Sequence, residues 1–316
     1  MDDLAVIVVS HNSARWIAPC LRSVFAHMGP LRADVVVVDA ESGDGTAEIV
    51  AGFPHVRLIR CANRGFAYAN NRGLMTCDAR YVLFLNPDTE ILEGSMSDLV
   101  ARLDARPGVG LVGVRQVDGE GRLDMTIRRF PNALRGLGDA LAAEHVPGRP
   151  RWLGERQLER AAYDREGGCD WTAGSFMLAR REAIESAGFM DERFFMYSEE
   201  TDFCRRIRGA GWEVRHVPWM TIRHYGAKVG VDPWIQSLDA YNRIAYARKH
   251  LSPVHRLVYS GTVLLRHALR AAVPGRGEGG TRRRAAHSAA VKTLLGRSPV
   301  PHGPPSSFSV RLRERS

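Results

Sequence analysis

Residues 35–46 read VVVVDAESGDGT, an apolar run that stops at an acid and leads into a loop of Gly, Ser and Asp. A continuous apolar run bounded by polar residues is typical of a strand buried on both faces of a parallel sheet. The Gly, Ser and Asp residues that follow favour a turn and a helix start, so we expect a helix over 46–51. The stretch therefore predicts one strand–loop–helix unit.

The same unit recurs along the chain. In the first half, strands are predicted at 4–9, 56–59 and 81–85, and helices at 14–28 and 66–77. In the second half, the pattern predicts strands at 170–179 and 212–217, and helices at 180–187, 199–210 and 235–251. This alternation indicates an α/β fold with a Rossmann-like, mostly parallel sheet flanked by helices. We expect one domain in two halves, residues 1–110 and 111–251, followed by C-terminal helices.

Charge is concentrated at the end of the chain. The 316 residues carry a net charge of +9, but residues 274–316 alone hold nine Lys or Arg and only two acids. Gly, Pro, Ser and Arg dominate this segment, which we expect to be disordered. The rest of the chain is nearly neutral, which argues against a nucleic-acid partner.

Cysteine usage and hydropathy indicate a cytoplasmic protein. Five cysteines without a CxxC pair fit reduced thiols better than a disulfide framework or a zinc site. The sequence has no basic segment followed by an apolar leader, and no uncharged apolar stretch of the ~18 residues that a spanning helix needs.

Polar residues follow each predicted strand of the first half. They are Ser10, His11 and Asn12, then Asp39 and Glu41, then Asn63, Arg64 and Gly65, and finally Asn86 and Asp88. Ligands of doubly wound folds bind at the carboxyl ends of the strands, so these residues predict a site for a polar ligand. Asp39 and Asp88 suit a divalent cation shared with phosphate oxygens, although both are also ordinary turn residues.

An acidic cluster marks a second candidate site. Residues 194–206, FFMYSEETDFCRR, place three acids within four residues after an aromatic run. Either these acids begin a helix, where the dipole stabilises negative charge, or one of them is a general base with a raised pKa beside the aromatic rings. His224, after the last predicted strand, is either a structural histidine or a metal ligand.

Six stretches together resemble the family 2 inverting glycosyltransferases of the GT-A fold. They are VIVVSHN (6–12), VVVVDAESGDGT (35–46), NRGFAYANNRG (63–73), FLNPD (84–88), WTAGSFMLARREA (171–183) and FFMYSEETDFCRRIRGAGW (194–212). FLNPD resembles the metal-binding Asp-x-Asp in the Asn-Pro-Asp form of the rhamnosyltransferase-like branch. His11 stands where the family usually has Tyr, and Glu200 stands where it usually has the catalytic Asp.

The resemblance implies a role for each matching residue. Asp39 reads the nucleobase with Ser10, His11 and Asn12, while Glu41, Asn63, Arg64, Gly65, Asn71 and Asn86 line the nucleotide site. Asp88 holds Mg²⁺ or Mn²⁺ with His224 as a further ligand, and Glu200 or Glu199 is the base. Trp171, Gly174, Ser175 and Asp202 face the acceptor.

The implied activity is transfer of L-rhamnose from dTDP-L-rhamnose to a glycan or a polyprenyl-linked glycolipid of the cell envelope. The alternatives are another donor (galactofuranose, N-acetylglucosamine or mannose) or a non-catalytic sugar-nucleotide-binding protein. Residues 252–273 predict an amphipathic helix with leucines on one face and mainly arginines opposite. This helix either binds the inner face of an anionic membrane or packs on the catalytic domain.

Overall fold

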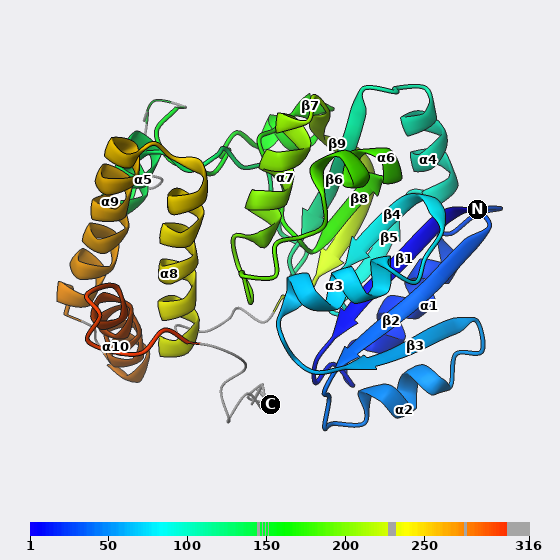
Figure 1. Cartoon of the computed structure of the whole chain (residues 1–316), viewed down its shortest axis with the longest axis horizontal. Coiled ribbons are helices and arrows are strands. Elements are labelled where there is room, and N and C mark those ends of the chain that lie inside the picture. Colours follow the sequence, from blue (N-terminus) through cyan, green and yellow to red (C-terminus); the bar gives the residue numbers. More distant parts are fainter. Residues whose placement is uncertain are drawn as a thin grey trace.

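The computed structural model describes residues 1–301 except 144, 145, 147, 149, 151, 227–231 and 275–276. A nine-stranded sheet joins strands from residue 2 to residue 224 (Figure 1). Its strands are β1 (Asp2–Ser10), β2 (Ala33–Ala40), β3 (Val56–Cys61), β4 (Ala79–Leu85), β5 (Thr89–Glu93), β6 (Val109–Val117), β7 (Gly167–Gly168), β8 (Phe176–Arg180) and β9 (Glu213–His224). Their order is β3-β2-β1-β4-β8-β6-β9-β5, with β7 paired to β9.

The first four strands are parallel, as predicted, and their carboxyl ends share one edge of the sheet. Strand β8 runs antiparallel between β4 and β6, and β9 runs parallel to β6. The predicted end of the last strand at Val217 is wrong, because β9 continues to His224. The register between β6 and β9 jumps from Val217 to Thr221, so Pro218 lies in a bulge that needs no ladder hydrogen bond.

Helices cover both faces of the sheet and bury two apolar clusters. One face carries α1 (Ile17–Ala26), α2 (Thr46–Ala51) and α4 (Met96–Asp104). The other face carries α3 (Phe66–Leu74), α6 (Arg181–Ala187) and α7 (Glu199–Gly209). Because strands β1, β2 and β4 are buried on both faces, their sequences read as continuous apolar runs.

Four further helices form a bundle beside the sheet, seen at the left of Figure 1. They are α5 (Ala133–Ala140), α8 (Pro233–His250), α9 (Pro253–Ala272) and α10 (Gly277–Leu294). Helix α9 packs on its neighbours through Tyr259 and Val263, which are buried, whereas Leu257 and Leu269 on its other side are exposed. Among the described residues no helix combines the length and the apolar character needed to cross a bilayer.

Three sequence expectations need correction. The prediction of disorder from residue 274 onward is wrong for 277–294, because α10 buries Ala286 and Ala290 against α8 and α9 while its arginines face outward. Residues 275–276 and 302–316, which the same prediction covers, lie outside the described residues. The strand predicted over 170–179 begins only at Phe176. The boundary at 110/111 falls inside β6, so it separates no structural units.

Candidate active site

The ends of β4 and β9 bring Asn86, Asp88 and His224 together. His224 Nε2 lies 3.3 Å from Asp88 Oδ1 and 3.4 Å from Asn86 Nδ2. Pairing of Thr89 with His224 in the β5–β9 ladder sets this position, and Tyr225 N–H donates to the Asp88 carbonyl at 2.9 Å. Burial disfavours the charged imidazole, but the hydrogen bond to Asp88 and its negative charge outweigh burial and raise the pKa of His224.

This pair fits a divalent metal only in part. Within the described residues, no group of three or more His, Cys, Asp or Glu side chains is arranged to hold a metal. Mg²⁺ in nucleotide enzymes uses one or two carboxylates and takes its other ligands from water and substrate phosphates. Asp88 and His224 therefore fit a metal whose remaining ligands come from a bound diphosphate.

A pocket of about 210 Å³ opens beside Asn86, at the carboxyl edge of the sheet. Of the predicted nucleotide residues, His11, Asn63, Gly65 and Asn86 line it. Phe195, Met196 and Trp234 also line it, and the sequence did not predict them as site residues. The aromatic run at 194–197 was the available signal for the first two.

Gly65 fixes how residues 194–196 close over this pocket. Its φ is +105°, and an added Cβ would lie 2.3 Å from the Phe195 carbonyl oxygen. The next N–H, of Phe66, donates to that same oxygen at 2.7 Å. Only glycine permits this close backbone approach, so Gly65 joins the start of α3 to the distant 194–196 loop.

Asp39 lies buried at the end of β2, opposite Ser10 on β1. The Ser10 hydroxyl donates to Asp39 Oδ1 at 3.0 Å, and the Ser42 N–H donates to Oδ2 at 3.3 Å. Asn12 holds the same loop by accepting from Gly43 N–H at 2.9 Å. These bonds fix the carboxylate of Asp39, which together with Glu41 lines a shallow hollow next to the nucleotide pocket.

Asn71 and Arg64, also predicted as nucleotide residues, do not line the pocket beside Asn86. Asn71 is buried, and its amide bonds Met190 backbone atoms at 2.9 and 3.1 Å and the Glu192 carboxylate at 2.9 Å. Arg64 is exposed and lies over the Tyr68 ring at 5.0 Å. Asn71 therefore joins α3 to the 190–192 loop, a role that its place in the sequence did not reveal.

A strained turn presents the acidic cluster. Tyr197 and Ser198 have φ of 72° and 71°, unusual for residues with a side chain, and Asn242 Nδ2 holds the turn by donating to the Met196 carbonyl at 2.9 Å. Helix α7 begins at the next residue, Glu199. Consecutive residues in sparsely populated conformations are a feature of functional sites.

The two candidate bases have different surroundings. Glu199 is 5% exposed and lines no described pocket, whereas Glu200 lines a pocket of about 290 Å³ on the side of α8. Burial raises the pKa of both carboxyls, and the neighbouring Glu200 charge raises that of Glu199 further. Within the described residues, Oε2 of each has no hydrogen-bond partner. The geometry therefore favours Glu200 over Glu199 as the group that meets an acceptor.

The Gly174–Ser175 segment joins Glu200 to the end of β4. A Cβ on Gly174 would lie 3.6 Å from Glu200 Cβ, and the Ser175 carbonyl accepts from Asn86 N–H at 3.0 Å. Trp171 lines the same pocket as Glu200. Ser175 itself does not face the acceptor, because its buried hydroxyl donates to Gln116 at 2.8 Å.

Asp202 is also a structural residue, contrary to the predicted contact with the acceptor. It is fully buried, with Arg206 Nε at 2.8 Å and both Lys249 Nζ and His250 Nε2 at 2.6 Å. Burial raises the pKa of a carboxyl, but here these three partners outweigh it, and the pKa of Asp202 is lowered. The residue ties α7 to the end of α8.

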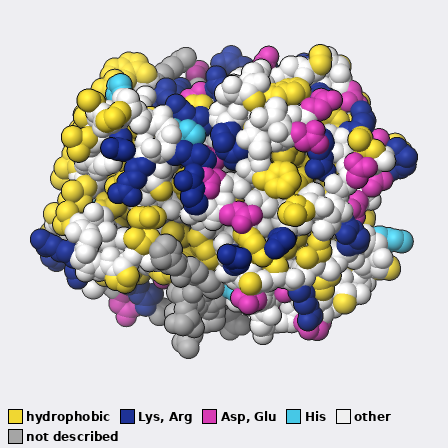
Figure 2. All heavy atoms as spheres, viewed as in Figure 1, with side chains coloured by type: hydrophobic (Ala, Val, Ile, Leu, Met, Phe, Trp, Pro, Cys, Tyr) yellow, Lys and Arg dark blue, Asp and Glu magenta, His cyan; other side chains and the backbone are white. Residues whose placement is uncertain are grey.

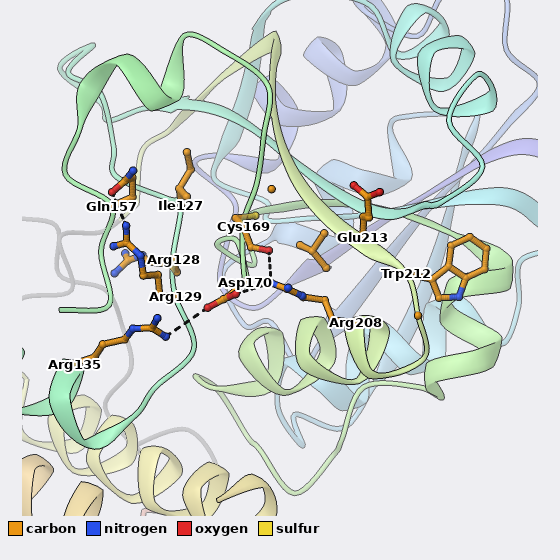
Figure 3. Close-up of a pocket in the computed structure, with 13 residues that line it drawn as sticks. Ile127, Arg128, Arg129, Arg135, Gln157, Cys169, Asp170, Arg208, Trp212 and Glu213 are labelled. Carbon is orange, nitrogen blue, oxygen red and sulfur yellow. Dashed lines mark hydrogen bonds and ion pairs between the residues drawn. The ribbon is translucent and has the colours of Figure 1, made fainter. Parts of the chain in front are cut away.

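The largest described cavity, of about 550 Å³, lies elsewhere (Figure 3). Asp170 lies between Arg135, at 3.5 Å, and Arg208, at 2.5 Å, and Glu213 lies at the start of β9. Since His224 ends the same strand, this cavity is at the opposite end of β9 from the Asp88 pair. It contains none of the predicted site residues.

Known proteins resemble this chain in sequence and in fold. The family model described as Glycosyl transferase family 2 matches residues 5–187. The N-acetylglucosaminyl-diphospho-decaprenol L-rhamnosyltransferase of Mycobacterium tuberculosis (strain H37Rv) is 32% identical over 260 residues, covering 78% of this chain and 83% of the relative. Rhamnosyltransferase WbbL of Escherichia coli (strain K12) is 23% identical over 228 residues, covering 70% of this chain and 82% of the relative.

Two solved structures share the fold. A mannosyltransferase from Pyrobaculum calidifontis, in complex with GDP-Man and Mn²⁺, aligns with a TM-score of 0.55 and 16% identity over 94% of this chain and 87% of that one. GalNAc-T7 with UDP, GalNAc and Mn²⁺ aligns with a TM-score of 0.60 and 15% identity over 94% of this chain and 56% of that one. The chain has the GT-A fold and belongs to glycosyltransferase family 2.

Proposed function

We propose that the protein is an inverting, metal-dependent rhamnosyltransferase that moves L-rhamnose from dTDP-L-rhamnose to a lipid-linked acceptor of the N-acetylglucosaminyl-diphospho-polyprenol class. One observation carries the proposal: the Gly174–Ser175 segment contacts Glu200 at one end and Asn86 at the other. A candidate base and a candidate diphosphate site are thus separated by two residues. The names of the relatives from M. tuberculosis and E. coli support the choice of sugar.

Glu200 acts as the general base in this proposal. Burial raises the pKa of its carboxyl, which makes the ionised form a stronger base than an exposed glutamate. That form accepts the proton of the acceptor hydroxyl as the oxygen attacks the anomeric carbon. Attack from the face opposite the departing diphosphate inverts the configuration at that carbon.

The donor binds at the carboxyl edge of the sheet. Asp39 accepts hydrogen bonds from the nucleobase, and the wall formed by Phe195 and Met196 excludes water from the sugar. Asp88 and His224 would hold the metal against the diphosphate, where Mg²⁺ or Mn²⁺ offsets the charge that develops on the leaving group. Mn²⁺ bound in the two structural neighbours agrees with a divalent metal.

A panel of nucleotide sugars tests the reaction. Purified protein is incubated with each donor and a short-chain prenyl diphosphate of N-acetylglucosamine, with Mg²⁺, with Mn²⁺ or with chelator. We expect dTDP release from dTDP-L-rhamnose only, only with metal, and a product of opposite anomeric configuration by NMR. Release of the nucleoside diphosphate from a different nucleotide sugar would show that another sugar is transferred. No release from any nucleotide sugar would overturn the enzyme assignment.

We also propose that the bundle docks on an anionic membrane, where a polyprenyl-linked acceptor resides. Leu257 and Leu269 of α9, Leu134 of α5 and Leu141 just after α5 are exposed. Figure 2 displays hydrophobic side chains along the edge where α9 lies in Figure 1. Exposed Arg256 adds positive charge beside them. Apolar side chains with adjacent arginines are typical of helices that lie in the interface of anionic bilayers.

Vesicle co-sedimentation tests this surface. Replacing these four leucines by serine should abolish sedimentation with vesicles that contain phosphatidylglycerol. Turnover of a water-soluble acceptor should be unchanged. Equal sedimentation of variant and wild type would refute the membrane proposal without affecting the proposed chemistry.

A further inference from the structure

The pocket that Glu200 lines reaches into the helical bundle. Glu200 and Trp171 belong to the catalytic domain, whereas Arg243 comes from α8 and Arg266 from α9. A smaller adjoining pocket of about 70 Å³ shares much of this lining and adds further residues. Its lining is Arg128, Asp139, Glu155, Arg156, Arg243, Arg266 and Arg270. The Glu200 carboxylate therefore lies at one end of the two adjoining pockets, and five arginines lie toward the other end.

Arg243 accounts for much of the negative charge in these pockets. Its Nη1 contacts both Glu155 oxygens at 3.0 Å, and its Nε lies 3.1 Å from Asp239 Oδ1. The Tyr259 hydroxyl also donates to Glu155, at 3.3 Å. The Glu155 carboxylate is thus satisfied by Arg243 and Tyr259, and that of Asp239 is paired with Arg243. Asp139 is the third acid of the lining, and the charges of Arg243 and Arg266 both act on it.

Arg128 and Arg266 are not satisfied in the same way. Within the described residues, neither forms an ion pair, and Nε of each is buried without a hydrogen-bond partner. The Arg128 guanidinium lies over the Trp171 ring, 5.5 Å from its centroid. Both residues line the Glu200 pocket and the smaller one, and Arg128 also lines the cavity of Figure 3. A buried guanidinium nitrogen without a partner is costly unless an anion binds beside it.

A third arginine increases this cost. Arg128 and Arg156 face each other across a bridge between antiparallel segments. Burial lowers the pKa of Arg128, and the charge of Arg156 lowers it further. Asp124 and Glu155 act on Arg128 in the opposite direction, and a bound anion would add to their effect. Arginine's planar fork also suits phosphate oxygens better than lysine does.

The same helices connect this pocket to the apolar surface of the bundle. Arg266 and Arg270 lie on α9, which exposes Leu265 and Leu269 next to them in sequence. Asp139 lies on α5 near exposed Leu141. A ligand with a diphosphate in the pocket and an apolar chain beyond it would match both features.

We propose that Arg128, Arg156, Arg266 and Arg270 bind the diphosphate of the lipid-linked acceptor and so direct its sugar hydroxyl toward Glu200. The inference rests on the proposed function for the nature of the acceptor. It assigns the arginines a role in acceptor recognition, separate from the donor diphosphate at Asp88.

Two acceptors that differ in phosphate test the assignment. One is a short-chain prenyl diphosphate of N-acetylglucosamine and the other is an octyl glycoside of the same sugar. Arg128→Gln and Arg266→Gln should each raise KM for the diphosphate acceptor about 10- to 100-fold, the usual effect of losing one charged hydrogen bond. KM for the octyl glycoside and for the donor should change less than twofold. Arg248→Gln, an exposed arginine on α8, is the matched control.

A binding measurement separates this inference from the proposed function. Calorimetric titration of geranyl diphosphate, with dTDP and Mg²⁺ saturating the donor site, should give binding that both pocket variants lose and Arg248→Gln keeps. That result would support the pocket even if rhamnose is not the sugar. Equal loss of turnover with both acceptors, or binding unchanged in both pocket variants, would overturn it.

Discussion

Replacing Glu200 by Gln separates the two candidate bases. The substitution keeps the shape of the side chain and removes only its ability to accept a proton. General-base catalysis contributes about 10²- to 10⁴-fold, so kcat should fall by that factor. KM for the donor should change little, because Glu200 lines the acceptor pocket and not the nucleotide pocket. Release of dTDP in the presence of acceptor measures both quantities.

Glu199→Gln is the comparison. Glu199 is buried next to Glu200 but lines no described pocket, so we expect kcat within about threefold of wild type. In wild type, kcat should rise with pH through the Glu200 pKa, above that of an exposed glutamate, because only the ionised form accepts a proton. If Glu200→Gln kept a third of the activity, or if both variants lost activity equally, the assignment of the base would be refuted.

Three further predictions concern metal, backbone and stability. Asp88→Asn should lower turnover about 10²- to 10³-fold and raise the Mn²⁺ concentration needed for half-maximal rate; an unchanged Mn²⁺ titration would exclude Asp88 as a ligand. Gly65→Ala forces a Cβ to within 2.3 Å of the Phe195 carbonyl and should lower the free energy of unfolding, measured by chemical denaturation, by about 2–4 kcal/mol. Gly43→Ala is the control, because its added Cβ meets no atom within 4 Å, and its free energy of unfolding should hardly change. Burial raises the pKa of Glu199 in the folded state, so between the unfolded-state and folded-state pKa values the folded protein binds more protons than the unfolded chain and loses stability as pH rises. Glu199→Gln should therefore have a higher melting temperature than wild type, by a margin that grows over that pH range. A margin that stays constant with pH would contradict the raised pKa.

Local sequence was a good guide where burial repeats with a regular period. The parallel strands β1 to β4 follow from apolar runs, and the polar residues after them lie on one edge as expected. The same reasoning was wrong at the C-terminal end, because composition there indicates disorder, whereas alanines spaced along α10 bury one face against α8 and α9. Composition averages over a segment, and a helix needs only one face to be buried.

The sequence by itself determined the order of strands and helices, the polar strand ends and the resemblance to family 2, because these depend on local spacing and on motifs in order. Only tertiary structure decided which polar residues face a ligand. The first turn of α7 contains Glu199, Glu200 and Asp202, and successive side chains of a helix point about 100° apart. The packing of α8 therefore determines that Glu200 lines a pocket while Asp202 is buried in ion pairs. Tertiary structure also brings together the acceptor arginines from three separate segments, a proximity that no local pattern records.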